Sequence, residues 1–303
     1  MSESNGMTVA ISGPNGLVGT ELRNILADAG HESIGISRSA GPDSIEWDPL
    51  TGIKDPSSLE GVDALVHLAG ESIASGRWNE ALKQRIVDSR VVGTRSLVQS
   101  LKDLTQKPRV LVCASAIGFY GDRGDEILDE NSPPGEGFLA ETCVQWEREA
   151  MAAAELGLRV VCIRIGVVLS PKGGALQKML LPFKLGGGGV VGNGRQYWSC
   201  IGLTDLARAI VFCIENDQMS GPVNGVCPDA SDNRTFTKTL GKVLNRPTII
   251  PLPAFAARLV LGEMADALLL ASTRVEPKRL QDAGFEYSCP DLESTLRHEL
   301  GRD

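Results

Sequence analysis

The sequence of 303 residues predicts an α/β fold, in which a doubly wound parallel sheet is followed by a smaller C-terminal α/β lobe. Apolar, strand-like runs alternate with helix-like periodicity between residues 8 and 165, and this alternation requires crossover connections between parallel strands. The run at residues 62–70 is apolar almost throughout, as in a strand that is buried on both faces. Hydrophobic residues make up 42% of the chain, which is sufficient for a core of this size.

The first predicted strand, residues 8–12, leads through a glycine-rich turn into a helix. Gly13 permits the tight turn, Gly16 lets a pyrophosphate approach the backbone, and Gly19 lets the helix pack on the strand. The amides at the helix N-terminus face such an anion. A glycine triplet alone is common in turns, but here the strand precedes it and the helix follows. The sequence therefore predicts a Rossmann-type dinucleotide site formed by Gly13, Asn15, Gly16, Leu17, Val18 and Gly19.

The second predicted strand, residues 31–36, ends at Ser37 and Arg38, where the adenosine ribose of a dinucleotide lies. An acidic residue there favours NAD, whereas an arginine flanked by serines suits a 2′-phosphate. We therefore expect NADP(H) rather than NAD(H), and the alternative is a solvated surface arginine. A possible third strand ends at Asp48, which either contacts the adenine edge or caps the following turn.

The strand within residues 62–70 ends in Leu68, Ala69 and Gly70, which we expect to contact the cofactor, while His67 is expected to be a hydrogen-bonded core residue. After a helix at 79–101, the strand at 109–113 leads to Ser115 and Tyr120 at the carboxyl edge of the sheet. Open α/β sheets bind their ligands at that edge. Ser115 either polarises a carbonyl or caps the strand. Tyr120 either donates a proton near the nicotinamide or forms a wall of the pocket.

The remaining pattern predicts two parts. Residues 7–165, completed by about 203–227, form the NAD(P)-binding domain, and residues 166–202 with 228–303 form the substrate lobe and small C-terminal domain. Predicted helices lie at 138–155, 204–214, 235–244, 256–270 and 291–300, strands at 158–165 and 222–226, and an extended segment at 249–253. We expect Arg195, Tyr197 and Trp198, in a polar and aromatic run, to contact an anionic or planar substrate, or else to form a lobe interface.

Composition excludes several classes of function. A net charge of −8 argues against nucleic acid and anionic lipid as partners. The seven cysteines contain no C-x-x-C pair and lie partly in apolar runs, and there are only three histidines, so we expect reduced thiols and no metal site. No run is long enough to cross a bilayer. We expect a cytoplasmic protein that binds a small-molecule substrate, and a homodimer is compatible with these features.

Several strings together resemble the extended short-chain dehydrogenase/reductases across essentially the whole chain. They are the glycine turn, the Leu68-Ala69-Gly70 strand end, and the stretches 115–122 and 164–169. The strings at 47–49, 77–78, 88–95, 120–124 and 137–141 look like one subgroup, the NAD-dependent epimerase/dehydratase-like "epimerase family" proteins. That subgroup carries a small C-terminal domain of unknown function, whose motif is similar to residues 277–280 and 283–285. The resemblance implies a nicotinamide cofactor, with Arg164 among its contacts. In better-known relatives it implies chemistry on nucleotide-linked sugars.

The catalytic residues of that superfamily are usually a serine, a tyrosine, and a lysine four residues after the tyrosine. In this sequence Leu139 stands in the position of the tyrosine and Cys143 in that of the lysine, and the serine falls on Ala116, next to Ser115. A register on Phe138 and Thr142 fails equally. The best available carboxylate base is then Glu141, although the helix dipole alone favours a glutamate in a first turn.

The segment at 192–207 resembles the one that grips a nucleotide diphosphate in sugar epimerases. Trp198 replaces its arginine and Gly202 its histidine, with Arg195 as the nearest substitute. Two functions therefore stay open. The first is an NADP-dependent oxidoreductase or epimerase with Tyr120, Ser115 and Glu141 nearest the chemistry. The second is a catalytically degenerate NADP(H)-binding protein with a regulatory or interaction role.

Overall fold

The computed structural model describes residues 6–39, 41 and 44–302, and it is built around one eight-stranded sheet of order β12-β8-β6-β5-β1-β2-β3-β4. All neighbouring strands are parallel except β3 and β4. The strands are β1 (Thr8–Ser12), β2 (Glu32–Ser37), β3 (Ser44–Asp48), β4 (Gly52–Ile53), β5 (Ala64–His67), β6 (Val110–Ala116), β8 (Arg159–Ile165) and β12 (Gly221–Gly225). The predicted doubly wound parallel sheet is confirmed.

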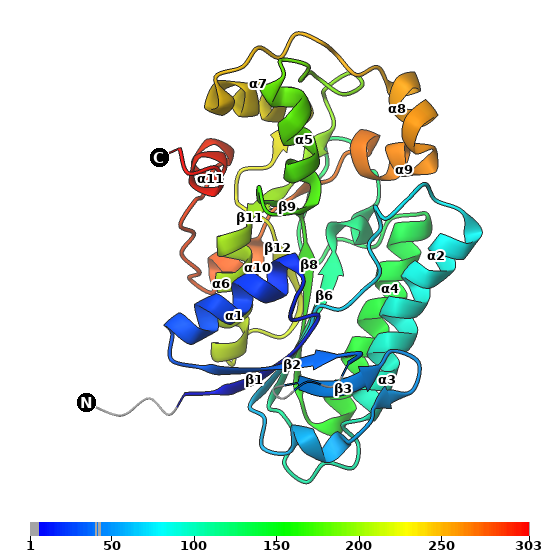
Figure 1. Cartoon of the computed structure of the whole chain (residues 1–303), viewed down its shortest axis with the longest axis vertical. Coiled ribbons are helices and arrows are strands. Elements are labelled where there is room, and N and C mark those ends of the chain that lie inside the picture. Colours follow the sequence, from blue (N-terminus) through cyan, green and yellow to red (C-terminus); the bar gives the residue numbers. More distant parts are fainter. Residues whose placement is uncertain (1–5, 40, 42–43, 303) are drawn as a thin grey trace.

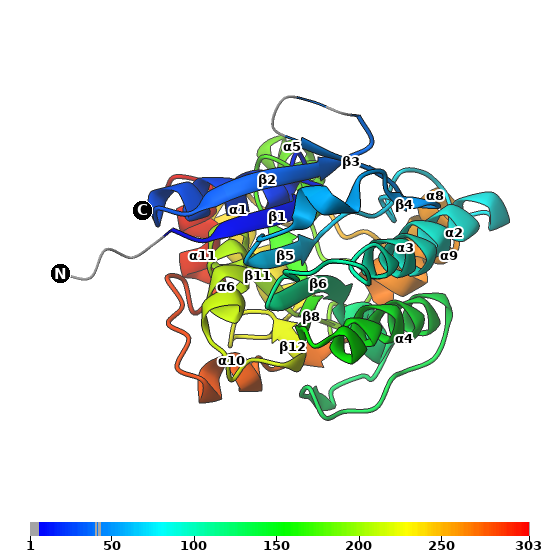
Figure 2. The ribbon, with the colours of Figure 1, turned by 90° about the horizontal axis from the view of Figure 1, so that it is seen from below.

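Helices cover both faces of this sheet (Figure 2). On one face α1 (Leu17–Asp28) and α6 (Leu203–Glu215) bury Leu22 and Ile210 in one core cluster. On the other face α2 (Glu80–Val87), α3 (Gly93–Gln99) and α4 (Phe138–Met151) lie over a second cluster that contains Leu97 and Trp146. A π turn, η2 (Asp88–Val92), joins α2 to α3, so the predicted helix at 79–101 is continuous through this turn. Its N-terminus is capped by Asn79, whose side chain accepts the amide of Leu82 at 2.8 Å.

The C-terminal lobe stands above the carboxyl ends of the strands (Figure 1). Its helices are α5 (Gly174–Lys184), α7 (Asn233–Leu244), α8 (Ala254–Leu261), α9 (Glu263–Ala265) and α11 (Leu292–Glu299). Short strand pairs support it: β9 (Val167–Leu169) with β11 (Cys200–Gly202), β10 (Tyr197–Trp198) with β13 (Ser231–Asp232), and β7 (Ile127–Leu128) with β14 (Arg274–Val275). The remaining short elements are η1 (Pro56–Leu59), η3 (Ile117–Tyr120), η4 (Ala152–Leu156), η5 (Asp266–Leu270) and α10 (Lys278–Asp282).

The lobe differs in detail from the prediction. The expected helix at 256–270 is broken at Gly262, whose φ of +63° does not fit a helix. The expected extended piece at 249–253 forms a single bridge, between Leu252 and Val191. Leu280 and Phe285 pack into the core beside α6, so this part of the C-terminal segment packs with the sheet and not with the lobe. Within the described ranges, no helix combines the length and apolar character needed to cross a membrane.

Candidate cofactor and substrate site

The glycine turn between β1 and α1 has the geometry of an anion-binding loop. Gly13 adopts φ +72°, and a side chain there would stand 3.1 Å from the backbone nitrogen of Ala69. A side chain at Gly19 would overlap the carbonyl oxygen of Gly13, so both positions require glycine. Helix α1 begins at Leu17 with no side-chain cap and no acidic residue in its first turn. Its amides and the positive end of its dipole are therefore available to an anion.

A hydrogen bond between the side chains of Ser12 and His67 connects the ends of β1 and β5 beside this loop. Both side chains are buried, and Ser12 Oγ lies 2.6 Å from His67 Nδ1. Ser12 Oγ also accepts the amides of Leu68 and Ala69, so its own proton is free for Nδ1. Burial lowers the pKa of His67 to about 4, with a smaller contribution from the charge of Arg90. His67 is therefore a neutral, hydrogen-bonded core residue, as predicted.

At the end of β2, Arg38 is exposed and borders a surface pocket of about 380 Å³. Lys54 also lines this pocket and is paired with Glu46 at 2.9 Å, whereas Arg38 has no ion-pair partner among residues 6–39, 41 and 44–302. Asp48 accepts the amides of Leu50 and Thr51, at 2.7 and 3.2 Å. Asp48 thus caps the turn, which was one of its two predicted roles. Ser37 Oγ donates to the carbonyl of Ser39 at 2.8 Å.

A buried polar network lies under the carboxyl edge of β6 and β8. Ser115 Oγ donates to Glu147 at 2.7 Å, and Arg164 donates from Nε and Nη2 to the two oxygens of Glu147, each at 2.8 Å. Arg164 Nη1 donates to the Tyr120 hydroxyl at 2.9 Å, and that hydroxyl donates to Asn224 at 2.7 Å. Burial by itself would lower the pKa of Arg164, but Glu147 raises it overall. Burial raises the pKa of Tyr120 to about 12.

This network contains two of the predicted site residues. Tyr120 is fully buried, and its hydroxyl donates to Asn224 and accepts from Arg164. Arg164 is 4% exposed, and its Nε, Nη1 and Nη2 each donate to Glu147 or Tyr120. Ser115 stays near the edge, with its orientation fixed by Glu147.

Helix α4 carries no tyrosine–lysine pair toward this edge. Leu139 is half-buried, and its Cβ would stand 3.3 Å from a side chain at Gly118. Cys143 is buried, and burial raises the pKa of its thiol to about 11. Glu141 is exposed and makes no side-chain hydrogen bond or ion pair with any described residue. The structure therefore gives Glu141 no fixed position as a base.

Arg90, which the sequence did not single out, lies at the same edge. A side chain at Gly70 would stand 3.4 Å from its Cζ, and its Nη1 donates to the carbonyl of Glu71 at 2.9 Å. The guanidinium lies 5.1 Å from the ring centroid of Trp146, and burial lowers its pKa. Its Nε and Nη2 have no acceptor within the described part of the chain. The one sequence signal for Arg90 was a cationic residue on the side of its helix that faces the sheet.

The other three predicted substrate residues, Arg195, Tyr197 and Trp198, have different surroundings. Trp198 belongs to the core of the lobe: it is 6% exposed, packs on Phe236 at 5.2 Å, and its Nε1 donates to Leu269. Its side chain therefore packs within the lobe. The ring of Tyr197 lies 4.8 Å from the guanidinium of Arg274. Arg195 is exposed on the preceding loop, where Asn193 accepts its amide.

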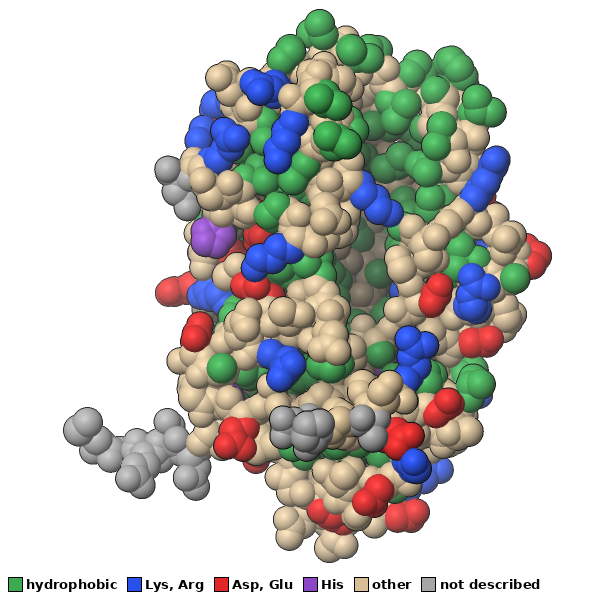
Figure 3. Space-filling view, viewed as in Figure 1, with side chains coloured by type: hydrophobic (Ala, Val, Ile, Leu, Met, Phe, Trp, Pro, Cys, Tyr) green, Lys and Arg blue, Asp and Glu red, His purple; other side chains and the backbone are tan. Residues whose placement is uncertain are grey.

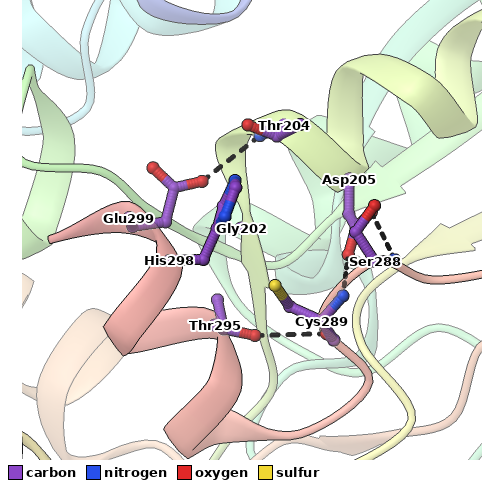
Figure 4. A pocket seen from close by; sticks show the side chains of 8 residues that line it. All are labelled: Gly202, Thr204, Asp205, Ser288, Cys289, Thr295, His298 and Glu299. Atoms are coloured by element: carbon purple, nitrogen blue, oxygen red, sulfur yellow. Dashed lines mark hydrogen bonds between the residues drawn. The ribbon is translucent and has the colours of Figure 1, made fainter. Parts of the chain in front are cut away.

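A seam between α6, residues 288–289 and α11 fills the space near Gly202 (Figure 4). The buried carboxylate of Asp205 accepts the amides of Ser288 and Cys289, both at 2.9 Å. Glu299 accepts the amide of Thr204 at 3.3 Å, and burial raises its pKa. A side chain at Gly202 would stand 3.1 Å from Glu299, so α11 occupies the room that a histidine would need. Asp205 and Glu299 both accept backbone amides from another segment of the chain.

A parallel sheet with this glycine turn and with a lobe over its carboxyl edge is the architecture of the extended short-chain dehydrogenase/reductases. The chain belongs to the NAD dependent epimerase/dehydratase family, whose model matches residues 9–224. Residues 252–299 match a domain of unknown function, DUF1731.

Relatives match over nearly the full length. An epimerase family protein of Mycobacterium tuberculosis is 44% identical over 92% of this chain and 93% of its own. The crystal structure of the human epimerase family protein SDR39U1 with NADPH superposes with a TM-score of 0.89 at 35% identity, covering 98% of this chain and all of that one. A nucleoside-diphosphate sugar epimerase of Corynebacterium glutamicum gives a TM-score of 0.82 at 38% identity, covering 99% of this chain and 59% of that one.

Proposed function

We propose that this protein is an NADP(H)-dependent oxidoreductase that acts on a carbonyl or hydroxyl compound. The observation that carries the proposal is the glycine turn with its uncapped helix N-terminus, followed at the end of β2 by the exposed Arg38. The turn would hold the pyrophosphate, with Asn15, Leu17 and Val18 beside it. Arg38 and Ser37 would hold a 2′-phosphate. The human relative that was crystallised with NADPH supports this choice of cofactor.

Residues at the ends of β5 and β6 would hold the nicotinamide end of the cofactor. These are Leu68, Ala69, Gly70 and Ser115. A bound nicotinamide supplies hydride transfer, and the protein supplies binding and orientation. Arg90 offers free N–H groups next to Gly70, so it binds and polarises the substrate oxygen. Glu147 fixes Ser115 Oγ through its hydrogen bond, which leaves the lone pairs of that oxygen for a ligand donor.

The competing function is an NADP(H)-binding protein that does not turn over. Leu139 in the position of the tyrosine and the buried, neutral Cys143 in that of the lysine favour it. Oxidation of NADPH, followed at 340 nm with a panel of ketones and aldehydes, separates the two functions. Turnover that Arg90→Met abolishes while NADPH affinity stays unchanged supports the oxidoreductase. Tight NADPH binding without turnover of any compound, together with altered binding of a partner protein, supports the alternative.

Titration calorimetry with NADPH and NADH tests the assignment of Arg38. Loss of a charge-assisted contact costs about 1.5–3 kcal/mol, so Arg38→Ala should weaken NADPH binding roughly 10- to 100-fold and leave NADH binding nearly unchanged. Arg23→Ala, an exposed arginine on the outer side of α1, is the control for net charge. Equal weakening of both nucleotides by Arg38→Ala would remove Arg38 from the 2′-phosphate site.

A further inference from the structure

Large hydrophobic side chains are exposed on two helices of the C-terminal lobe. Leu181 on α5 is 66% exposed and Leu185, which follows it, 78%; on α8, Phe255 is 73% and Leu259 75% exposed. Figure 3 shows hydrophobic side chains on both sides of a cleft that separates the part of the lobe with α5 from the part with α8 and α9. The cleft descends toward the carboxyl edge of the sheet. Exposed apolar side chains that gather beside a cleft are typical of a binding site.

Contacts show how the walls of this cleft are placed. Lys178 on α5 donates to the carbonyl of Ala74 at 3.3 Å, and Leu181 and Leu185 follow it on the same helical face. On the other side, Lys83 pairs with Glu263 of α9 at 2.6 Å. A side chain at Gly262 would stand 2.8 Å from Nε of Arg77. The segment 71–78 therefore runs between the two apolar walls.

Aromatic side chains lie at the end of the segment 71–78. The rings of Trp78 and Phe138 meet edge to face at 5.2 Å, beneath the amine of Lys83. Leu139, next to Phe138, packs on Gly118 at the carboxyl edge. The position in which the superfamily carries its catalytic tyrosine thus has an aliphatic side chain, which follows Phe138 in α4.

Two of the polar groups expected for binding a nucleotide-linked sugar are replaced in this chain. Trp198, in the position of the phosphate-binding arginine, is buried in the lobe core. Gly202, in the position of the histidine, is covered by Thr295 and Glu299 of α11. Both replacements remove groups that would bind a diphosphate, and the exposed Arg195 is the one cationic residue left in the segment 192–207.

We propose that the cleft between α5 and α8 binds the apolar part of a hydrophobic carbonyl compound, a ketone or aldehyde with a long alkyl chain or fused rings. Its oxygen end reaches the carboxyl edge of the sheet, where Leu139 lies against Gly118 and Arg90 against Gly70. This inference rests on the proposed function, because it names the substrate class of that site. Apolar side chains on both sides of a cleft above the sheet edge fit a small molecule that enters the cleft. The test also distinguishes this occupant from a second copy of the chain.

Calorimetric titration of the NADP⁺-loaded protein, which cannot reduce a ketone, with the series from 2-pentanone to 2-undecanone tests the inference. Each methylene buried in the cleft should tighten binding about threefold to fourfold. Phe255→Ser/Leu259→Ser should weaken 2-undecanone binding at least tenfold and 2-pentanone binding little. The matched control is Met151→Ser, an exposed apolar residue 13 positions along α4 from Phe138, about 20 Å away. The NADPH affinity of each variant checks that the fold is intact.

Three results would overturn the inference while NADPH still binds. They are an affinity independent of chain length, UDP-glucose binding more tightly than 2-undecanone, and a double variant that behaves like Met151→Ser. A concentration-dependent dimer that Leu259→Ser disperses, with no ketone binding, would assign the face to a second copy and overturn it too. Failure to bind NADPH at all would overturn the proposed function, and with it the inference.

Discussion

Replacing Glu147 with alanine breaks the buried ion pair that organises the carboxyl edge. Arg164 and Glu147 are 4% and 13% exposed, so the lone guanidinium would remain inside the protein without a counter-charge. Losing one partner of such a pair costs about 3–5 kcal/mol of unfolding free energy. The same helix supplies the control, because Glu149 makes the same bidentate pair with Arg95. In that pair the arginine is 46% exposed to solvent. An exposed pair is worth about 0–1 kcal/mol, so Glu149→Ala should cost far less.

Urea unfolding followed by circular dichroism measures the difference between these two variants. The double variant Glu147→Leu/Arg164→Met should recover part of the loss, because no buried charge is then left unpaired. Equal losses for Glu147→Ala and Glu149→Ala would refute the reasoning, since burial would then not decide the cost. A double variant less stable than the sum of the two single changes predicts would refute it as well.

Three further outcomes follow from the structure. Asp205→Ala removes the acceptor of two backbone amides and the ion pair with Arg208, so it should lower the free energy of unfolding in urea by about 2–4 kcal/mol. The control is Asp232→Ala, which removes a helix cap and should cost about 1 kcal/mol. The pKa of His67 falls from 6.5 to about 4 on folding, so the unfolded chain takes up a proton between these pH values and the folded protein does not. The free energy of unfolding should therefore be unaffected by His67 above pH 6.5 and should fall by about 1.4 kcal/mol per pH unit toward pH 4. A His67→Asn variant whose unfolding free energy has the same pH dependence as that of the parent would contradict this. All seven cysteines are buried, so a thiol reagent at pH 8 should label none of them in the native protein and all seven in urea. Fast labelling of Cys143 in the native protein would contradict the burial of its thiol.

The fold could be predicted because its signals are local. The alternation of strand and helix patterns, the glycine turn and the apolar strand around His67 each lie within a few residues of sequence. Steric demands at Gly13 and Gly19 follow directly from that turn. The predicted cap at Asn79 and the turn-capping role of Asp48 are also short-range hydrogen bonds.

The roles of the site residues could not be predicted in the same way, because long-range contacts decide them. Tyr120 is at the predicted edge of the sheet, but its hydroxyl points inward to Asn224, 104 residues away in sequence. Arg164 is neutralised by Glu147 on α4, 17 residues earlier, a pairing that no spacing rule indicates. Trp198 lies in a polar run of the sequence, but its side chain is buried in the hydrophobic core of the lobe. Arg90 was missed because its surroundings, Gly70 and Trp146, come from other elements.

The crystal structure of this protein grown with NADPH tests the central claim most directly, namely that the turn between β1 and α1 carries a pyridine dinucleotide. We expect the pyrophosphate to lie against the amides of residues 13–19, the 2′-phosphate within hydrogen-bond reach of Arg38, and the nicotinamide beside Gly70. A dinucleotide bound elsewhere, or a turn that stays empty while calorimetry also detects no binding of NADPH or NADH, would contradict it.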